Sequence, residues 1–180
     1  MAIILLLSGP NLNLLGEREP EHYGTTTLDD LVTIASEVAA KRGYDLEHVH
    51  SNHEGALIDA IHGARGRCAA IVFNPGAFSH YAYALTDALA MYEGVKIEVH
   101  LSNPYARETW RHHSVISPVV DGTITGLRAV GYRLAVDAAA TLLEERSRLF
   151  RPHRSHPATW RRASSVSGRT SPTRHSMRCS

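Results

Sequence analysis

Near its N-terminus the 180-residue chain reads IILLLSGPNLNLLGEREPEHYG over residues 3–24. The apolar run Ile3–Leu7 stops at the turn residues Ser8-Gly9-Pro10, a pattern typical of a strand buried on both faces of a sheet. Glycine and proline then recur too closely for a helix, so residues 9–24 are expected to form a loop. Open α/β sheets bind ligands at the carboxyl ends of their strands. The loop carries Asn11, Arg18 and Tyr23, and we predict that it forms half of an active site and acts partly as a lid.

Strand-like and helix-like runs alternate along the rest of the chain. The expected strands are residues 3–7, 45–50, 69–73, 95–101 and 123–127, and the expected helices are residues 28–42, 54–64, 79–94 and 131–145. Thr27, with Asp30 three residues later, has the pattern of a capping box, and Gly43 is a typical helix end. Such alternation is typical of βαβ units with right-handed crossovers. We therefore predict an α/β fold, a flavodoxin-like, doubly wound five-stranded parallel sheet in the order 2-1-3-4-5.

Charge divides the chain into two parts. Residues 1–145 contain all 18 acidic residues and 10 Lys and Arg residues, a net charge of −8, whereas residues 146–180 contain 9 Arg and no acid. The Arg-, Ser- and Pro-rich end cannot bury enough apolar surface to offset its ordering entropy. We expect one folded, function-bearing domain over residues 1–145. The basic tail, residues 146–180, is expected to be disordered and solvated, and not to bind nucleic acid.

The compartment is indicated by three features. No apolar run reaches the roughly 18 residues that a membrane helix needs. The N-terminus lacks the basic flank of a secretory signal. Cys68 and Cys179 form no disulfide framework, as expected in a reducing compartment. We expect a cytoplasmic protein without membrane attachment.

Polar residues lie at the carboxyl ends of three of the expected strands. Asn11, Asn74 and His100 should lie on one rim, because the carboxyl ends of parallel strands meet at the same edge. His100 is a candidate general acid, and Glu98, on the same strand face, could orient its imidazole. Amides such as those of Asn11 and Asn74 stabilise charge that develops on oxygen, but asparagine beside proline or glycine is equally typical of a turn.

Further candidates lie downstream of these strands. The turn after His100 should expose the backbone amides of Leu101 and Ser102, which could bind a carboxylate. His80, near the start of the third helix, could bind a hydroxyl or a carboxylate, and Asp87, seven residues later, lies on a similar helical face. Arg111 belongs to the basic segment 107–113, whose composition is more typical of an exposed helix.

Six sequence blocks combine these candidates. They are GPNLNLLGEREPEHYG (residues 9–24), SNHEG (51–55), NPGAFSH (74–80), EVHLSN (98–103), RHHS (111–114) and GY (131–132). In this order they closely resemble the type II 3-dehydroquinate dehydratases, and the similarity extends over residues 3–143. The resemblance implies the flavodoxin-like fold. It also implies dehydration of 3-dehydroquinate to 3-dehydroshikimate, without a cofactor or metal, as in the shikimate pathway of aromatic biosynthesis.

The resemblance also implies roles for individual residues. A loop tyrosine is usually a surface or packing residue, but Tyr23 matches the family's base, and Arg18 matches the lid arginine that favours its phenolate form. His100 would act as the general acid and Asn11 would stabilise the enolate. The residues that would hold the substrate are Asn74, His80, Leu101, Ser102 and Arg111.

The family match extends to the assembly. The residue that corresponds to Asp87 reaches the site of a neighbouring subunit in the family, which implies trimers and, for this family, a dodecamer. Thr86 stands where relatives usually have arginine, so the contacts between subunits could differ here.

Other functions have weaker signals. The 12 histidines include no His-x-x-x-His pair on a helix, and there is no cysteine pair, so we predict no bound metal. Neither a Gly-x-Gly-x-x-Gly motif after the first strand, nor a Walker lysine, nor a Gly-x-Ser-x-Gly elbow is present. A flavodoxin-like module that binds a nucleotide or flavin is an alternative, but residues 11–15 are too apolar for a phosphate loop. A nucleic-acid-binding protein that acts through the basic tail is a third alternative.

Overall fold

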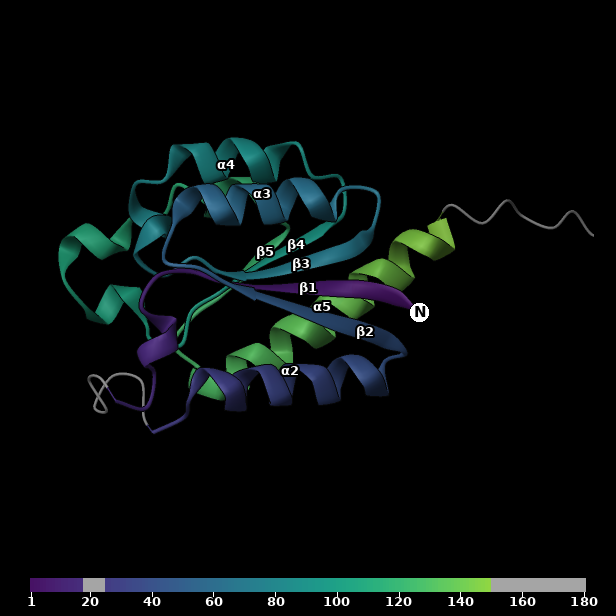
Figure 1. Ribbon diagram of the computed structural model, residues 1–180, viewed down its shortest axis with the longest axis horizontal. Coiled ribbons are helices and arrows are strands. Elements are labelled where there is room, and N and C mark those ends of the chain that lie inside the picture. Colours follow the sequence, from purple (N-terminus) through teal and green to yellow (C-terminus); the bar gives the residue numbers. More distant parts are fainter. Residues whose placement is uncertain (18–24, 150–180) are drawn as a thin grey trace, which may run out of the picture. The chain divides into compact units, whose positions relative to one another are not determined.

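Five parallel strands form one sheet in the computed structural model, which describes residues 1–17 and 25–149. They are β1 (Ala2–Ser8), β2 (Tyr44–His50), β3 (Cys68–Asn74), β4 (Val95–Val99) and β5 (Gly122–Ile124). Their order in the sheet is β2-β1-β3-β4-β5 (Figure 1). The predicted doubly wound, flavodoxin-like arrangement is therefore confirmed.

Helices cover both faces of this sheet. They are α2 (Leu28–Lys41), α3 (Glu54–Ala64), α4 (Tyr83–Ala90) and α5 (Arg128–Leu149). Helices α2 and α5 lie on one face and α3 and α4 on the other (Figure 1). Ile4 and Leu6 of β1 pack into the core beneath α2 and α5, and Leu5 and Leu7 pack beneath α3 and α4. Both faces of β1 are buried, which explains its uninterrupted apolar sequence. None of these described helices is long and apolar enough to cross a membrane.

The start and end of α2 follow the predicted chemistry. The Thr27 hydroxyl accepts a hydrogen bond from the Asp30 amide, and the Asp30 carboxylate accepts one from the Thr27 amide, which forms a complete capping box. Gly43, at φ 78°, follows the last turn in the left-handed conformation that favours glycine. Local sequence signals therefore determine both ends of this helix.

The third helix differs from its prediction. The sequence pattern predicts one helix over residues 79–94, but a 3-10 helix at Gly76–His80 is separate from α4. The backbone leaves the helical region at Tyr81, whose φ is −154°. Helix α4 ends early because Tyr92 turns into the core, where its hydroxyl donates to the Cys68 carbonyl at 2.7 Å.

Strand ends and the last helix also differ from their predictions. The pattern predicts the fifth strand at residues 123–127, but Gly126, at φ 81°, donates to the Ser102 carbonyl, so the chain has already turned away. Strand β4 ends at Val99, which places His100 just beyond it. Helix α5 continues to Leu149, four residues past the expected end of the domain. An ion pair from Arg146 to Asp121, at 2.8 Å, supports this extension. Residues 150–180 lie outside the described chain.

The carboxyl ends of β1 and β3 approach each other closely. The Gly9 amide donates to the Asn74 carbonyl at 2.8 Å, and a β-carbon on Gly9 would lie 2.5 Å from the Pro75 oxygen. The crossovers from these two strands run to opposite faces of the sheet, so a crevice opens between them. Glycine at position 9 is required because the two loops touch here.

We expect Gly9→Ala to lower the free energy of unfolding by about 1–3 kcal/mol, because overpacking a tight contact costs that much. Gly63→Ala is the matched control. Gly63 is exposed in α3, and a β-carbon added there would meet nothing within 4 Å. Gly63→Ala should raise the free energy of unfolding by up to about 1 kcal/mol. Urea unfolding measures both, and a Gly9→Ala protein as stable as the parent would contradict the close contact.

Candidate active site

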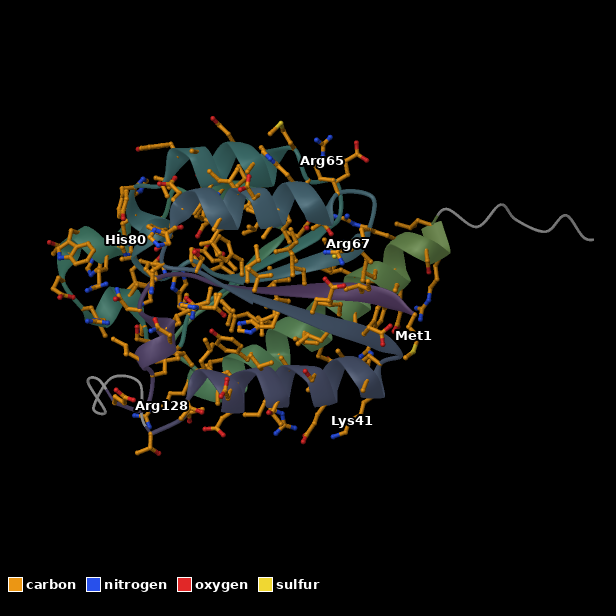
Figure 2. All side chains as sticks on the ribbon, in the orientation of Figure 1. Met1, Lys41, Arg65, Arg67, His80 and Arg128 are labelled. Carbon is orange, nitrogen blue, oxygen red and sulfur yellow. The ribbon has the colours of Figure 1, made fainter. Side chains whose placement is uncertain are left out.

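A cavity of about 150 Å³ opens where β1, β3 and β4 end. Seven of the ten predicted site residues line it, namely Asn11, Asn74, His80, His100, Leu101, Ser102 and Arg111. The labelled His80 lies at the opposite end of the sheet from Arg65, Arg67 and Met1 (Figure 2). Segments far apart in the sequence therefore meet at the rim that was predicted. Arg18 and Tyr23 lie outside the described residues.

His100 is held by a buried carboxylate. Its Nε2 donates to Oε1 of Glu98 at 2.8 Å, and Glu98 has no solvent-exposed surface. Burial acts to raise the pKa of Glu98, but hydrogen bonds from His100, Ser117 and Ser114, together with the His100 charge, outweigh it and lower that pKa below its ordinary value. Glu98 is therefore an anion, and Nδ1 of His100 is left for a ligand.

Asn74 is fixed by two hydrogen bonds. Its Oδ1 accepts from the Gly76 amide at 3.0 Å, and its Nδ2 donates to the Tyr132 hydroxyl at 2.8 Å. Both Asn74 and Tyr132 are buried, and burial raises the pKa of the Tyr132 phenol. The phenol stays neutral, and one amide hydrogen of Asn74 remains for a ligand in the cavity.

Asn11 both forms a turn and lines the cavity. Its backbone is left-handed, with φ 64°, a conformation that asparagine tolerates better than most residues. Its amide donates to Oδ1 of Asn52 at 2.8 Å, which fixes the turn against the loop after β2. The sequence left open whether Asn11 forms a turn or presents its amide to a ligand, and its position in the structure is compatible with both.

Arg111 lines the cavity, although the short helix that carries it is otherwise exposed. It lies in a short 3-10 helix, Thr109–His112, and its side chain is only 19% exposed. The guanidinium lies 4.0 Å from the ring centre of Trp110, and its Nε donates to Glu108 at 2.7 Å. The composition-based expectation of an exposed helical segment holds for residues 108–110, 112 and 113, whereas Arg111 itself turns toward the cavity.

His80 is oriented by the segment that carries Arg111. Its Nδ1 donates to the His113 carbonyl at 2.8 Å, and its Nε2 has only a long contact of 3.4 Å with the Ser79 hydroxyl. Burial lowers the pKa of His80 below its ordinary value, the hydrogen bond to His113 opposes this shift, and the Arg111 charge adds to it. The ring is therefore neutral near pH 7 and can donate or accept a hydrogen bond.

The turn after His100 presents two amides. The carbonyls of Leu101 and Ser102 accept from the amides of Arg128 and Gly126, which anchors the turn. Within residues 1–17 and 25–149 their own amides donate to no other group. Together with the side chains of Arg107 and Arg111 in the cavity wall, they form an environment suited to a carboxylate.

Comparison with known proteins agrees with this geometry. A sequence model of the family described as Dehydroquinase class II matches residues 2–140. The chain belongs to the class II dehydroquinase family.

Individual relatives are similar over most of their length. A protein named 3-dehydroquinate dehydratase from Bacillus licheniformis is 57% identical over 136 residues, which is 76% of this chain and 94% of the relative. One named Catabolic 3-dehydroquinase 2 from Aspergillus flavus is 55% identical over 139 residues, 77% of this chain and 93% of the relative. The crystal structure of type II dehydroquinase from Propionibacterium acnes has a TM-score of 0.75 at 47% identity, and the match covers 78% of this chain and 97% of that one.

Asp87 is the one predicted site residue within the described chain that does not line this dehydroquinase cavity. The prediction that it shares a helical face with His80 is wrong, because His80 lies in the separate 3-10 helix. Asp87 is exposed on α4. Its role in a neighbouring subunit stays a prediction.

One residue of the cavity wall and several residues that hold the cavity residues in place were missed from the sequence. Arg107 lines the cavity with a side chain only 8% exposed, although the composition of its segment indicated a surface. Tyr132 and Ser114 lie in the blocks that carry the dehydroquinase resemblance, but no role followed from their spacing. Asn52 and Ser117 act through long-range contacts that a single sequence does not reveal. Within the described residues there is no group of three or more His, Cys, Asp or Glu that could hold a metal.

We expect Tyr132→Phe to lower the free energy of unfolding by about 1–3 kcal/mol, because the buried Asn74 amide loses its acceptor. Tyr83→Phe is the matched control, since Tyr83 is 67% exposed. Its effect should stay within about 0.5 kcal/mol. If urea unfolding gave the two variants equal stability, the Asn74–Tyr132 hydrogen bond would make no net contribution to the free energy of unfolding.

Proposed function

We propose that this chain dehydrates 3-dehydroquinate to 3-dehydroshikimate, without a cofactor, by anti elimination through an enolate. Tyr23 is the base and His100 is the general acid. The observation that carries the proposal is His100, fixed by an ionised and fully buried Glu98 at the edge of a polar cavity. The family supports the reaction, because relatives about half identical to this chain are named for it.

The first step removes a proton next to the substrate ketone. The Tyr23 phenolate takes the proton, and the C–H bonding electrons move into the enolate. Arg18, on the same loop, favours the phenolate by its charge. The enolate oxygen is stabilised by the Asn11 amide, directly or through a water. The roles of Tyr23 and Arg18 rest on the sequence resemblance, since both lie outside the described residues.

The second step expels the hydroxyl group. The enolate electrons form the conjugated double bond while the C–O bond breaks, and Nδ1 of His100 gives its proton to the departing oxygen, which leaves as water. His100 can act this way only with protons on both nitrogens. Glu98 supplies the anionic partner for Nε2 and keeps the ring orientation fixed.

The remaining residues hold the substrate. The amides of Leu101 and Ser102 suit its carboxylate, because they have no acceptor within the described chain. Asn74, His80 and Arg111 provide donors for its hydroxyl groups, and each is itself held by neighbouring residues. Such fixed donors bind a polyol without first having to be ordered.

The chain is also proposed to be cytoplasmic and to assemble into trimers and dodecamers, with Asp87 reaching a neighbouring site. Asp87 lies between Tyr83, which is 67% exposed on α4, and Met91, which caps the helix and is 49% exposed, at four-residue spacing. This face is available to another copy of the chain. One relative is named a catabolic 3-dehydroquinase and another simply 3-dehydroquinate dehydratase 2, and the same reaction serves either direction of metabolism.

The direct test is turnover of 3-dehydroquinate, followed by the absorbance of the conjugated enone, with EDTA as a control for metal. We expect His100→Ala and Tyr23→Phe each to lose more than about tenfold in kcat, since a positioned acid or base contributes roughly 10²–10⁴. His62→Ala, at an exposed histidine of α3, should keep its activity. Near-parental kcat in Tyr23→Phe would remove Tyr23 as the base.

Arg18→Ala should also reduce kcat/KM, most strongly at low pH. Without the guanidinium the phenol is harder to ionise, so the acidic limb of the pH profile should move to higher pH. Arg65→Ala, at an exposed arginine on the opposite end of the sheet, is the control (Figure 2). An unchanged acidic limb in Arg18→Ala would reject this role.

A further inference from the structure

The carboxylate of Glu98 is an ion with no access to solvent. It lies on β4, inside the sheet, where Glu98 pairs with Phe73 of β3 and with Thr123 of β5. A buried carboxylate costs several kcal/mol unless it is paired and its oxygens accept hydrogen bonds. The hydrogen bond from His100 engages only one acceptor position of the carboxylate. Other donors must therefore account for the low pKa of Glu98.

Hydroxyl groups supply those donors. Oε1 accepts from Nε2 of His100 and from Ser114 at 3.0 Å. Oε2 accepts from Ser117 in a short hydrogen bond, and Thr123 lies 3.4 Å from the same oxygen. Both carboxylate oxygens are therefore occupied, and two of the donors come from one short segment, residues 114–117.

The hydroxyl hydrogen of Ser114 has a fixed direction. Its oxygen accepts hydrogen bonds from the amides of Ile116 and Ser117, at 3.2 and 3.0 Å. With these lone pairs used, the O–H is left to donate, and Glu98 is its acceptor. A serine that merely filled space would not need this arrangement, so the segment is built to present donors to the carboxylate.

We propose that Ser114 and Ser117 are positioning residues for the elimination, which act through Glu98 to keep both imidazole protons on His100. This inference rests on the proposed role of His100 as the acid. Without the hydroxyl donors, Glu98 becomes more basic and takes the Nε2 proton. The result is a neutral pair, and a neutral imidazole is a far weaker acid at Nδ1 than an imidazolium.

The same segment links the acid to the substrate-binding residues. The His113 carbonyl orients His80, and Arg111 lies three residues before Ser114. The segment is anchored from outside the site, because the Val115 amide donates to the Ser79 carbonyl at 2.7 Å and the Thr86 hydroxyl donates to the Val115 carbonyl at 3.1 Å. Residues 111–117 therefore set the geometry of three candidate site residues together.

The pH dependence of turnover tests the proposal. Ser117→Ala should lower kcat about tenfold with little change in KM and move the basic limb of the kcat profile to higher pH, because the His100–Glu98 pair then holds its proton more tightly. Ser117→Thr restores a hydroxyl and should recover most of the activity. Thr86→Val is the matched control, since it cuts an anchor of the same segment without touching Glu98, and it should leave the basic limb unchanged.

A second measurement does not depend on turnover. NMR titration of histidine-labelled protein should show a neutral His100 ring in Ser117→Ala at a pH at which the parent carries protons on both ring nitrogens, and the parental ring state in Thr86→Val. Coincident titrations and pH profiles for the parent and Ser117→Ala would overturn the proposal, even if the variant is less stable. Full activity in His100→Ala would instead overturn the proposed function and leave the NMR result standing.

Discussion

The hydrogen bond between Glu98 and His100 is the interaction on which the site depends. A carboxylate inside a sheet is stable only when its charge is matched and both oxygens are bonded. Strand β4 supplies Glu98, the residue after it supplies His100, and residues 114–117 supply hydroxyls. These groups hold the imidazole by Nε2, so its other nitrogen is the one that can serve the reaction. The same few atoms therefore stabilise the buried carboxylate and orient the imidazole.

The topology explains why the cavity lies where it does. Strands β1 and β3 are neighbours in the sheet, but their crossovers leave toward opposite faces. The loops that follow these strands diverge. The contact between Gly9 and Pro75 fixes the distance between the two loops where they begin. Strand β4 is next in the sheet and brings His100 to the same rim. A parallel sheet thus gathers Asn11, Asn74 and His100 without any of them being near in sequence.

Much of this could be predicted from the sequence, because the signals are local. The apolar run of β1, the capping box at Thr27 and the turn that ends β3 after Asn74 each follow from a few adjacent residues. The limits of α4 could not be predicted, because its start follows from the backbone angles of Tyr81 and its end from the burial of Tyr92. The hydroxyls of Ser114 and Ser117 are ordinary in composition, and only the folded chain brings them to Glu98. The composition of residues 107–113 predicted that Arg111 is exposed to solvent. In the folded chain the Trp110 ring and the Glu108 carboxylate lie against its guanidinium.

The central claim is that Glu98 orients His100 so that Nδ1 delivers a proton to the leaving oxygen. A crystal structure with a non-reacting analogue of 3-dehydroquinate tests it directly. We expect Nδ1 of His100 within about 3 Å of the oxygen that would depart, with Nε2 still bonded to Glu98 and with Tyr23 on the opposite face of the ligand's ring. A ligand whose departing oxygen faces away from His100, or a flipped imidazole that has left Glu98, would contradict it.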